Sequence, residues 1–298
     1  MIYRPTKDKI RRLAREYRAL ARRNPRAIYE ILMTEIPEMV YNSNAIENST
    51  LTLKDTEDIL LRNQVKKDHD IREIYEAKNL AKITEKLAQN PRQKISVEQI
   101  LRLHKILLSD INDRIAGRFR GRDEWVRIGR HLGANPDFVG ELVSELVTQY
   151  NNDNTTYFLA KIAHFHAEFE TIHPFNDGNG RIGRVLINQQ LMAFGLPPII
   201  IRNKSKHREY YPLFDNYRHT NKVDGFTELF AHLLLESLHK RIAILTAKRI
   251  VSLNDFAKSH GINPASLNNK ARRQTIPAFR EQNIWKIAAD FEYEKEKK

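Results

Sequence analysis

"HPFNDGNGRIGR", residues 173–184, brings three of the chain's eleven glycines together with a histidine, an aspartate and two arginines. Because glycine loses more backbone entropy on folding than other residues, such a cluster indicates a loop whose backbone approaches something closely. Helical apolar patterns precede it (residues 157–172) and follow it (residues 180–195), and Pro174 disfavours helix at the histidine. The stretch therefore predicts a tight loop that leads into the N-terminus of a second helix.

The start of that second helix is predicted to bind an anion. Backbone N–H groups of the DGNG segment (residues 177–180) have no partner within the helix, and the positive end of the helix dipole lies behind them. Arg181 and Arg184 are three residues apart in the first turn and are expected to point at one anion. Since cations are unfavourable at a helix N-terminus, two arginines there favour a bound phosphate.

Two further side chains complete a chemical hypothesis. Asp177 lies beside the expected anion and suits a Mg²⁺ ion that bridges phosphate oxygens. His173 is the nearby group that can take a proton near neutral pH. A base, a metal carboxylate, an amide cradle and an arginine clamp together indicate attack on a nucleotide phosphate.

This stretch resembles the signature of the Fic family, His-Pro-Phe-x-Asp/Glu-Gly-Asn-Gly-Arg-x-x-Arg, and matches it at every fixed position. The resemblance extends over roughly residues 96–245 and includes "GLPPIIIRNKSKHREYYPLF" (195–214). It implies an all-helical core that transfers AMP from ATP to a Ser, Thr or Tyr hydroxyl of a target protein, including the chain itself, with release of pyrophosphate.

The resemblance also implies roles for individual residues. His173 would deprotonate the target hydroxyl, and Asp177 would hold Mg²⁺. A phosphate nest would be formed by Gly178, Asn179 and Gly180, and Arg181 and Arg184 would grip the β- and γ-phosphates. Tyr210 and Tyr211 would line the adenine pocket, although buried packing is an equal alternative for both. A flap that docks the target by strand addition would comprise Trp125, Val126, Arg127 and Ile128.

A second motif lies near the N-terminus. In "SNAIEN" (43–48), Ser43 and Glu47 fall on one helical face, and the pattern resembles the family's inhibitory motif Ser/Thr-x-x-x-Glu-Gly/Asn. It implies a built-in inhibitory helix of the class II type, whereas a solvated surface helix is the alternative. The direction of the chemistry stays open, because Glu47 could also position water to remove AMP from a modified protein.

Composition and hydrophobic periodicity predict the class of protein, the fold class and the domain boundaries. The 298 residues carry a net charge of +13, which favours a polyanionic partner. The chain has no cysteine, no signal-peptide pattern and no apolar run long enough to span a membrane. These features favour a cytoplasmic protein without membrane association. Helical periodicity predominates, and "GRFRGRDEWVRIG" (117–129) predicts a short exposed hairpin. We expect a mainly α fold with an N-terminal helical region (1–92), a catalytic core (93–249) and a C-terminal unit (250–298).

The C-terminal unit has its own pattern. Ser252 and Asp255 form a capping pair, a turn is expected at Gly261, and the spacing to Leu267 suits a helix-turn-helix followed by a small wing. Six Lys or Arg residues face two acids between 251 and 286. DNA binding through 251–286 and an ordinary helical cap are equal alternatives. A nucleotide-sensing DNA-binding regulator on a Fic scaffold is therefore a third interpretation, and a homodimer is left open.

Overall fold

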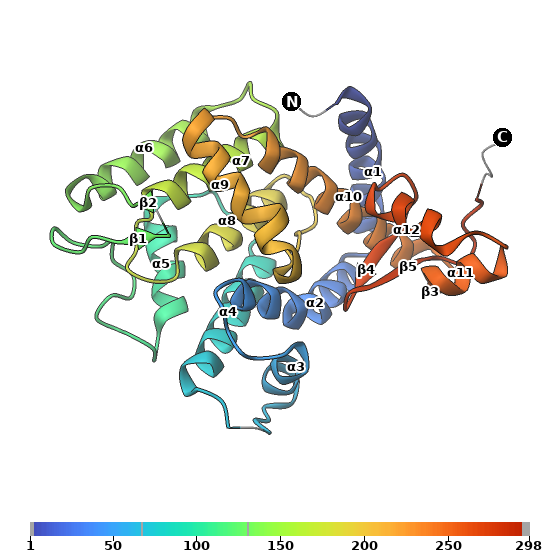
Figure 1. Cartoon of the computed structure of the whole chain (residues 1–298), viewed down its shortest axis with the longest axis horizontal. Helices are drawn as coiled ribbons and strands as arrows, with labels where there is room; N and C mark the ends of the chain where they lie inside the picture. Colours follow the sequence, from blue (N-terminus) through green and yellow to red (C-terminus); the bar gives the residue numbers. More distant parts are fainter. Residues whose placement is uncertain (1–2, 67, 130, 294–298) are drawn as a thin grey trace. The chain divides into compact units, whose positions relative to one another are not determined.

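The computed structural model describes residues 3–66, 68–129 and 131–293, and most of them lie in α-helices (Figure 1). Within these residues the β-structure consists of two small antiparallel sheets, so the predicted mainly α class is confirmed. Contacts group the chain into a first unit, Leu32–Phe230, and a second unit formed by the residues before and after it. This grouping differs from the predicted boundaries after residues 92 and 249, which stay a prediction about sequence modules.

The first unit is built from helices packed around a buried helical pair. Its α-helices are α2 (Pro25–Ile46, here from Leu32 on), α3 (Leu53–Arg62), α4 (Ile71–Gln89), α5 (Val97–Leu108), α6 (Val139–Asn152), α7 (Phe158–Ile172), α8 (Asn179–Ala193), α9 (Tyr211–Thr220) and the start of α10 (Asp224–Thr246). Helix α7 packs against α6, α8 and α9, whereas α4 packs against α3, α5 and α8. Helix α8 is therefore covered from several sides.

The α7–α8 pair carries the loop that the sequence singled out. Apolar side chains of both helices, among them Phe165, Phe169, Ile182 and Leu186, are buried in one core. Gly183 permits the close approach, because a Cβ there would lie 2.2 Å from Oε1 of Glu170. A side chain at this position would have to displace the buried Glu170 carboxyl and crowd the buried His166 ring, both on α7.

The predicted hairpin at 117–129 lies further along the chain than expected. Strand β1 (Arg127–Ile128) pairs with β2 (His131–Leu132), whereas residues 117–126 form turns and irregular structure. The hairpin was predicted too close to the N-terminus, because the glycines and charged residues of 117–126 form turns that precede the first strand. His131 fixes the hairpin on α7 through a 3.1 Å hydrogen bond between Nε2 and the carbonyl of Thr171.

One helix was not predicted, and another ends within an expected one. Helix α9 was missed because the chain before it, residues 195–205, is rich in Pro and Ile without helical periodicity, and short turns (η2, Asn203–Ser205; η3, Lys206–Tyr210) precede the helix. Helix α2 ends at Ile46 and contains Pro37. Ser43 therefore lies in the helix, as the inhibitory-helix interpretation expects, whereas Glu47 lies one residue beyond its end.

The second unit contains α1 (Arg4–Arg23), the rest of α10 and a compact C-terminal fold. Strand β3 (Ile250–Ser252) is followed by α11 (Leu253–Ser259) and α12 (Pro264–Arg272), then by β4 (Phe279–Glu281) and β5 (Ile284–Ala288). The sheet order is β3-β5-β4, all antiparallel. Gln282 and Asn283 both have positive φ, which matches the right-handed twist of a tight two-residue hairpin.

The C-terminal fold has its own apolar core. Phe256, Leu267 and Ile287 are buried there, one each from α11, α12 and β5. The expected capping of α11 is present, since the Ser252 hydroxyl accepts a hydrogen bond from the backbone N–H of Asp255. No helix in the described ranges is long and apolar enough to cross a bilayer.

Candidate active site

The chain leaves α7 at His173 in a left-handed conformation, with φ 53° and ψ 65°. The helix ends there as the His173-Pro174 pair predicts, and the backbone N–H of His173 still donates to the carbonyl of Phe169 at 2.9 Å. The side chain is mostly buried, and Nδ1 lies 3.3 Å from the carbonyl oxygen of Glu170. If Nδ1 carries the proton, Nε2 is the nitrogen that can accept one.

A buried arginine that sequence reasoning missed holds this turn. The Arg120 guanidinium donates to the carbonyls of His173 (2.8 Å) and Ile172 (3.1 Å), and its backbone N–H donates to the carbonyl of Pro174 (3.0 Å). In the sequence Arg120 belongs to the charged run "GRFRGR", which resembles solvated surface. Three consecutive carbonyls at the end of α7 are therefore fixed by one residue from a distant turn.

The middle of the loop is stabilised by packing and by an asparagine. Phe175 is fully buried and stacks on the ring of His104 from α5, with centroids 3.7 Å apart. The Asn179 amide donates to the carbonyl of Phe175 (2.7 Å) and accepts from its N–H (2.8 Å). The side chain of Asn179 thus holds the loop closed, so any contact with a phosphate is left to its backbone.

His104 fixes the loop from the other side. Its Nδ1 accepts from the N–H of Gly117 at 3.0 Å, so Nε2 donates to the carbonyl of Asp177 at 2.9 Å. Burial lowers the pKa of His104 to about 4, although the Asp177 carbonyl opposes this shift. The ring is neutral at physiological pH and joins Gly117 to Asp177 through its two nitrogens. No short motif in the sequence indicated this role.

Helix α8 begins at Asn179, and its N-cap residue Gly178 has φ 83° and supplies no side-chain cap. The first turn also contains Gly180, and a Cβ at that position would lie 2.3 Å from Oε1 of Glu47. The Glu47 carboxylate therefore lies against Gly180 in the first turn of α8. The anion cradle at residues 178–180 stays a prediction, and the anion beside it in this structure belongs to the protein.

Glu47 is held in the cradle by Arg184. The Arg184 guanidinium is buried and donates to Oε1 of Glu47 (2.7 Å), to the Ser43 hydroxyl (3.0 Å) and to the Ser43 carbonyl (2.9 Å). Burial would raise the pKa of Glu47, but the charge of Arg184 and its hydrogen bond lower it. The two residues of the SNAIEN motif thus meet the last arginine of the loop motif across 137 and 141 residues of sequence.

The end of α2 is fastened by the segment after α8. The Lys206 ammonium donates to the carbonyls of Ala45 and Ile46, each at 2.9 Å, and to Oδ1 of Asn48 at 2.9 Å. The Tyr211 hydroxyl donates to the carbonyl of Ile46 at 2.7 Å. A cation at a helix C-terminus is favourable, so this segment stabilises the position from which Glu47 reaches the cradle.

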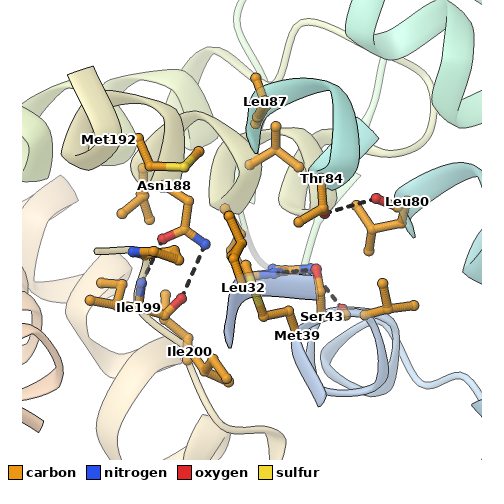
Figure 2. A pocket seen from close by; sticks show the side chains of 16 residues that line it. Leu32, Met39, Ser43, Leu80, Thr84, Leu87, Asn188, Met192, Ile199 and Ile200 are labelled. Atoms are coloured by element: carbon orange, nitrogen blue, oxygen red, sulfur yellow. Dashed lines mark hydrogen bonds between the residues drawn. The ribbon is translucent and has the colours of Figure 1, made fainter. Parts of the chain in front are cut away.

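Apolar packing supports the same contact from behind. Figure 2 shows a pocket beside Ser43, with side chains of α2, α4, α8 and the chain after α8 around it. Its labelled lining residues are Leu32, Met39, Ser43, Leu80, Thr84, Leu87, Asn188, Met192, Ile199 and Ile200. Around this pocket Leu32 and Val40 of α2 belong to the same buried apolar core as Leu80 of α4 and Val185 of α8, so helix α2 is fixed by its apolar face as well as by its polar end.

Arg181 does not share an anion with Arg184 in this state. Its buried guanidinium lies 2.8 Å from Oδ1 of Asp177 and 2.7 Å from Oε1 of Glu76 on α4. Burial would raise the pKa of Asp177, but Arg181 and Arg72 lower it. The two arginines expected to grip phosphates thus have different partners: Arg184 pairs with Glu47, and Arg181 pairs with Asp177 and Glu76.

The two tyrosines differ from each other. Tyr210 is buried, and its hydroxyl lies 2.7 Å from Nε2 of His166 inside a cluster of aromatic rings. Tyr211 is only partly buried and contacts the end of α2. In the predicted flap, Trp125 is 53% exposed and the carbonyl of Val126 accepts from the N–H of Gly133. Arg127 and Ile128 form β1 beside it.

Electrostatics keep the central histidine neutral. Burial lowers the pKa of His173 to about 4, against the opposing effects of the Glu170 carbonyl and the Glu47 charge. The Glu170 carboxyl is buried behind it, and burial raises the pKa of that carboxyl to about 8. At neutral pH His173 is therefore an unprotonated base beside an uncharged carboxylic acid.

These shifts predict how stability depends on pH. Burial lowers the pKa values of His104, His166 and His173 to about 4, 3 and 4, whereas the unfolded side chains titrate near 6.5. Between about pH 4 and 6.5 the unfolded chain binds more protons, so the free energy of unfolding should fall as pH falls through this window. Glu170 has the opposite effect, because burial raises its pKa to about 8 and the folded chain binds the proton more tightly than the unfolded chain. The free energy of unfolding from this group therefore falls as pH rises from 4.5 towards 8. Urea unfolding across pH 4.5–7.5 measures the balance, and a flat profile between pH 4.5 and 6.5 would contradict the buried neutral histidines.

Comparison with known proteins shows what the chain resembles. Residues 94–191, which include the loop at 173–184, match the model of the Fic/DOC family. The protein adenylyltransferase fic-1 of Caenorhabditis elegans is 33% identical over 178 residues, which are 58% of this chain and 34% of that protein. The chain thus spans about a third of the length of the curated relatives it matches.

Solved structures extend the likeness in fold. A segment of C. elegans Fic-1 has a TM-score of 0.65 at 26% identity and covers 78% of this chain and 71% of its own. A Fic family protein of Desulfovibrio desulfuricans G20 has a TM-score of 0.67 at 20% identity, over 99% of this chain and 98% of its own. At that identity the second likeness concerns the fold alone.

Proposed function

We propose that this chain is a Fic-domain protein adenylyltransferase that transfers AMP from ATP to a hydroxyl of a target protein, and that Glu47 keeps it inactive at rest. The observation that carries the proposal is the Glu47 carboxylate over Gly180, paired with Arg184, at a helix start beside a neutral histidine. A helix N-terminus with an arginine behind it is a phosphate site, and here a carboxylate fills it. The curated relatives named protein adenylyltransferase support the same activity.

The reaction assigns one task to His173. Nε2 takes the proton of the target hydroxyl as its oxygen attacks the α-phosphorus of ATP. The new O–P bond forms while the bond from the α-phosphorus to the bridging oxygen breaks, and pyrophosphate leaves. The Arg120 contacts and the left-handed turn hold the histidine for this step, since a general base must lie within hydrogen-bond reach of the proton it removes.

The α8 cradle and Arg184 would hold the phosphates once Glu47 has left. Backbone N–H groups of Gly178, Asn179 and Gly180 start the helix without a side-chain cap, and Arg184 is a buried cation that needs an anionic partner. Arg181 would bind the phosphates only after it had released its present partners, Asp177 and Glu76. Tyr211 and the segment around it would lie beside the adenine.

A Mg²⁺ ion fits the donor set in one way. No group of three or more histidine or acidic side chains in the described parts of the chain forms a metal cage, so a protein-only site is not formed. Mg²⁺ commonly binds through one or two carboxylates plus substrate phosphates, and Asp177 beside the cradle offers one carboxylate in that position. When bound, the ion would neutralise developing phosphate charge, and Asp177 would hold it.

The test is transfer of label from a panel of nucleotides. Wild type and Glu47→Gly are incubated with α-labelled ATP, CTP, GTP and UTP, and mass spectrometry identifies the modified residue. Strong labelling from ATP by the variant supports the proposal. Equal use of all four donors would still support transfer of a nucleotide to protein, but it would refute a preference for adenine. Release of AMP from a premodified target by wild type, but not by Glu47→Gly, would instead favour the reverse reaction. The cytoplasm, where ATP is abundant, is the compartment we expect.

A second function, duplex DNA binding through residues 251–286, is favoured by the surface of α12. This helix follows α11 after a turn at Gly261 and exposes Ser266, Asn269, Arg272 and Arg273, while Leu267 and Ala271 are buried. A polar and basic exposed face beside a β-hairpin is the arrangement that recognition helices present to a groove.

DNA binding predicts a measurable salt dependence. Arg272→Ala with Arg273→Ala should reduce the slope of log affinity against log salt by about 2, since each phosphate contact contributes about 0.9. Fluorescence anisotropy with a labelled duplex measures it, and Lys248→Ala with Arg249→Ala, an exposed basic pair just outside the range, is the matched control. If no duplex binds even at low salt, the unit is a cap or a protein-docking module.

A further inference from the structure

Arg72, which lies outside every motif in the sequence, binds the carboxylate assigned to the metal. It is the second residue of α4, where the N-cap Asp70 accepts its backbone N–H at 2.9 Å. Its Nη2 donates to Oδ2 of Asp177, and its Nε donates to Oε1 of Glu76 at 3.0 Å. Arg72 therefore connects the start of α4 with the loop before α8.

The contact belongs to a closed ring of four charges. Arg181 pairs with the other oxygen of Asp177, Oδ1, and with the same oxygen of Glu76 that Arg72 uses. Asp177 thus directs each of its two oxygens at a guanidinium. A divalent cation that binds Asp177 competes with these two guanidinium groups for the carboxylate oxygens, which are the ligands that Mg²⁺ prefers, and like charges so close together repel each other.

The two arginines differ in how readily they can leave. The side chain of Arg181 is 3% exposed, so releasing its carboxylates would strand a buried charge. The side chain of Arg72 is 50% exposed and can be rehydrated at little cost. Arg72 is the replaceable partner, and Oδ2 is the oxygen that becomes accessible.

From this ring we infer that Arg72 competes with the metal for Asp177: its guanidinium neutralises Oδ2 at rest and leaves when the divalent cation binds. Arg72 is a positioning residue that sets the metal concentration at which the site fills. It acts on the metal side of the site, whereas Glu47 acts on the phosphate side. The inference rests on the proposed role of Asp177 as the metal ligand.

The experiment measures metal affinity directly. Mn²⁺ is titrated into Glu47→Gly protein with the non-cleavable ATP analogue α,β-methylene-ATP, and unbound Mn²⁺ is followed by electron paramagnetic resonance. Adding Arg72→Gln should tighten Mn²⁺ binding by roughly threefold to fivefold, which is the effect of a half-exposed ion pair. Lys78→Gln, which removes an exposed cation from the same helix, should leave the affinity unchanged.

The outcomes separate this inference from the proposed function. Unchanged or weaker Mn²⁺ binding in Arg72→Gln overturns the competition, and so does equal tightening by Lys78→Gln, which would indicate bulk charge alone. Asp177→Asn tests the premise, because unaltered Mn²⁺ affinity in that variant would refute the metal role of Asp177 itself. If glutamine disturbs the first turn of α4, as judged by circular dichroism, Arg72→Ala provides the same comparison.

Discussion

His173→Ala is expected to lower AMP transfer, including self-modification, by about 10²- to 10⁴-fold, the usual effect of losing a general base. Nucleotide affinity should change little, because the cradle at the start of α8 and the Arg184 guanidinium are untouched. Initial rates with α-labelled ATP, measured in the Glu47→Gly background, report the first quantity, and calorimetry with α,β-methylene-ATP reports the second.

A second histidine of α7 provides the control for this variant. His164 lies on the exposed side of the same helix, so His164→Ala should keep full activity. In the active background the acid limb of the rate profile should lie below the ordinary histidine pKa, because burial lowers the pKa of His173. Near-normal transfer by His173→Ala would remove the histidine from the mechanism.

Glu47→Gly is expected to raise the rate of AMP transfer by roughly 10²-fold, the scale of the loss that a misplacement of about 1 Å causes. At rest the Glu47 carboxylate occupies the space over Gly180 and engages Arg184, so a phosphate cannot settle there. With glycine at position 47, the phosphate takes both the space and the cation. Initial rates of wild type and variant at equal ATP concentration measure the effect.

The same substitution should change the response of stability to ATP. Removing Glu47 leaves the buried Arg184 guanidinium without its carboxylate, but the Glu47 side chain is 40% exposed and Arg184 keeps its Ser43 contacts. The cost therefore lies below the about 3–5 kcal/mol of a fully buried pair. The variant should therefore melt at a lower Tm than wild type and gain more from ATP. Arg184→Ala should not raise the rate of AMP transfer, because it removes the cation that would bind the phosphate together with the partner of Glu47.

A carboxylate elsewhere in the first unit provides the control for the activation. Glu85 is exposed on α4, and Glu85→Gly should leave the rate of transfer unchanged. If Glu47→Gly remains folded and its rate equals that of wild type, the carboxylate over the cradle has no inhibitory effect and the SNAIEN segment is only the end of a helix.

The local features of the site could be predicted because they depend on neighbouring residues. The end of α7 at His173, the loop through Gly178 and the start of α8 follow from proline, glycine and helical periodicity within twelve positions. The approach of Ser43 and Glu47 to Arg184 could be anticipated only through the resemblance to the family, since nothing in the spacing of residues joins positions so far apart.

The supports of the site could not be predicted, because each reaches it from a distant segment. Arg120, His104 and Arg72 resemble ordinary surface or helix residues in the sequence, and only the fold shows which carbonyl or carboxylate each one contacts. The expectation that Arg181 and Arg184 meet one anion considered their common helix face, but not Glu76 on α4 and Glu47 just after α2, which bind them separately here.

The central claim is that the cradle of α8 presents the α-phosphorus of ATP to His173 once Glu47 has left. The most direct measurement compares ATP labelled at the α-phosphate with ATP labelled at the γ-phosphate, using Glu47→Gly and the double variant Glu47→Gly/His173→Ala. The account predicts that label from the α-phosphate is bound covalently by protein in Glu47→Gly alone and that label from the γ-phosphate is released with pyrophosphate. Transfer of the γ-label, or equal α-labelling without His173, would contradict it.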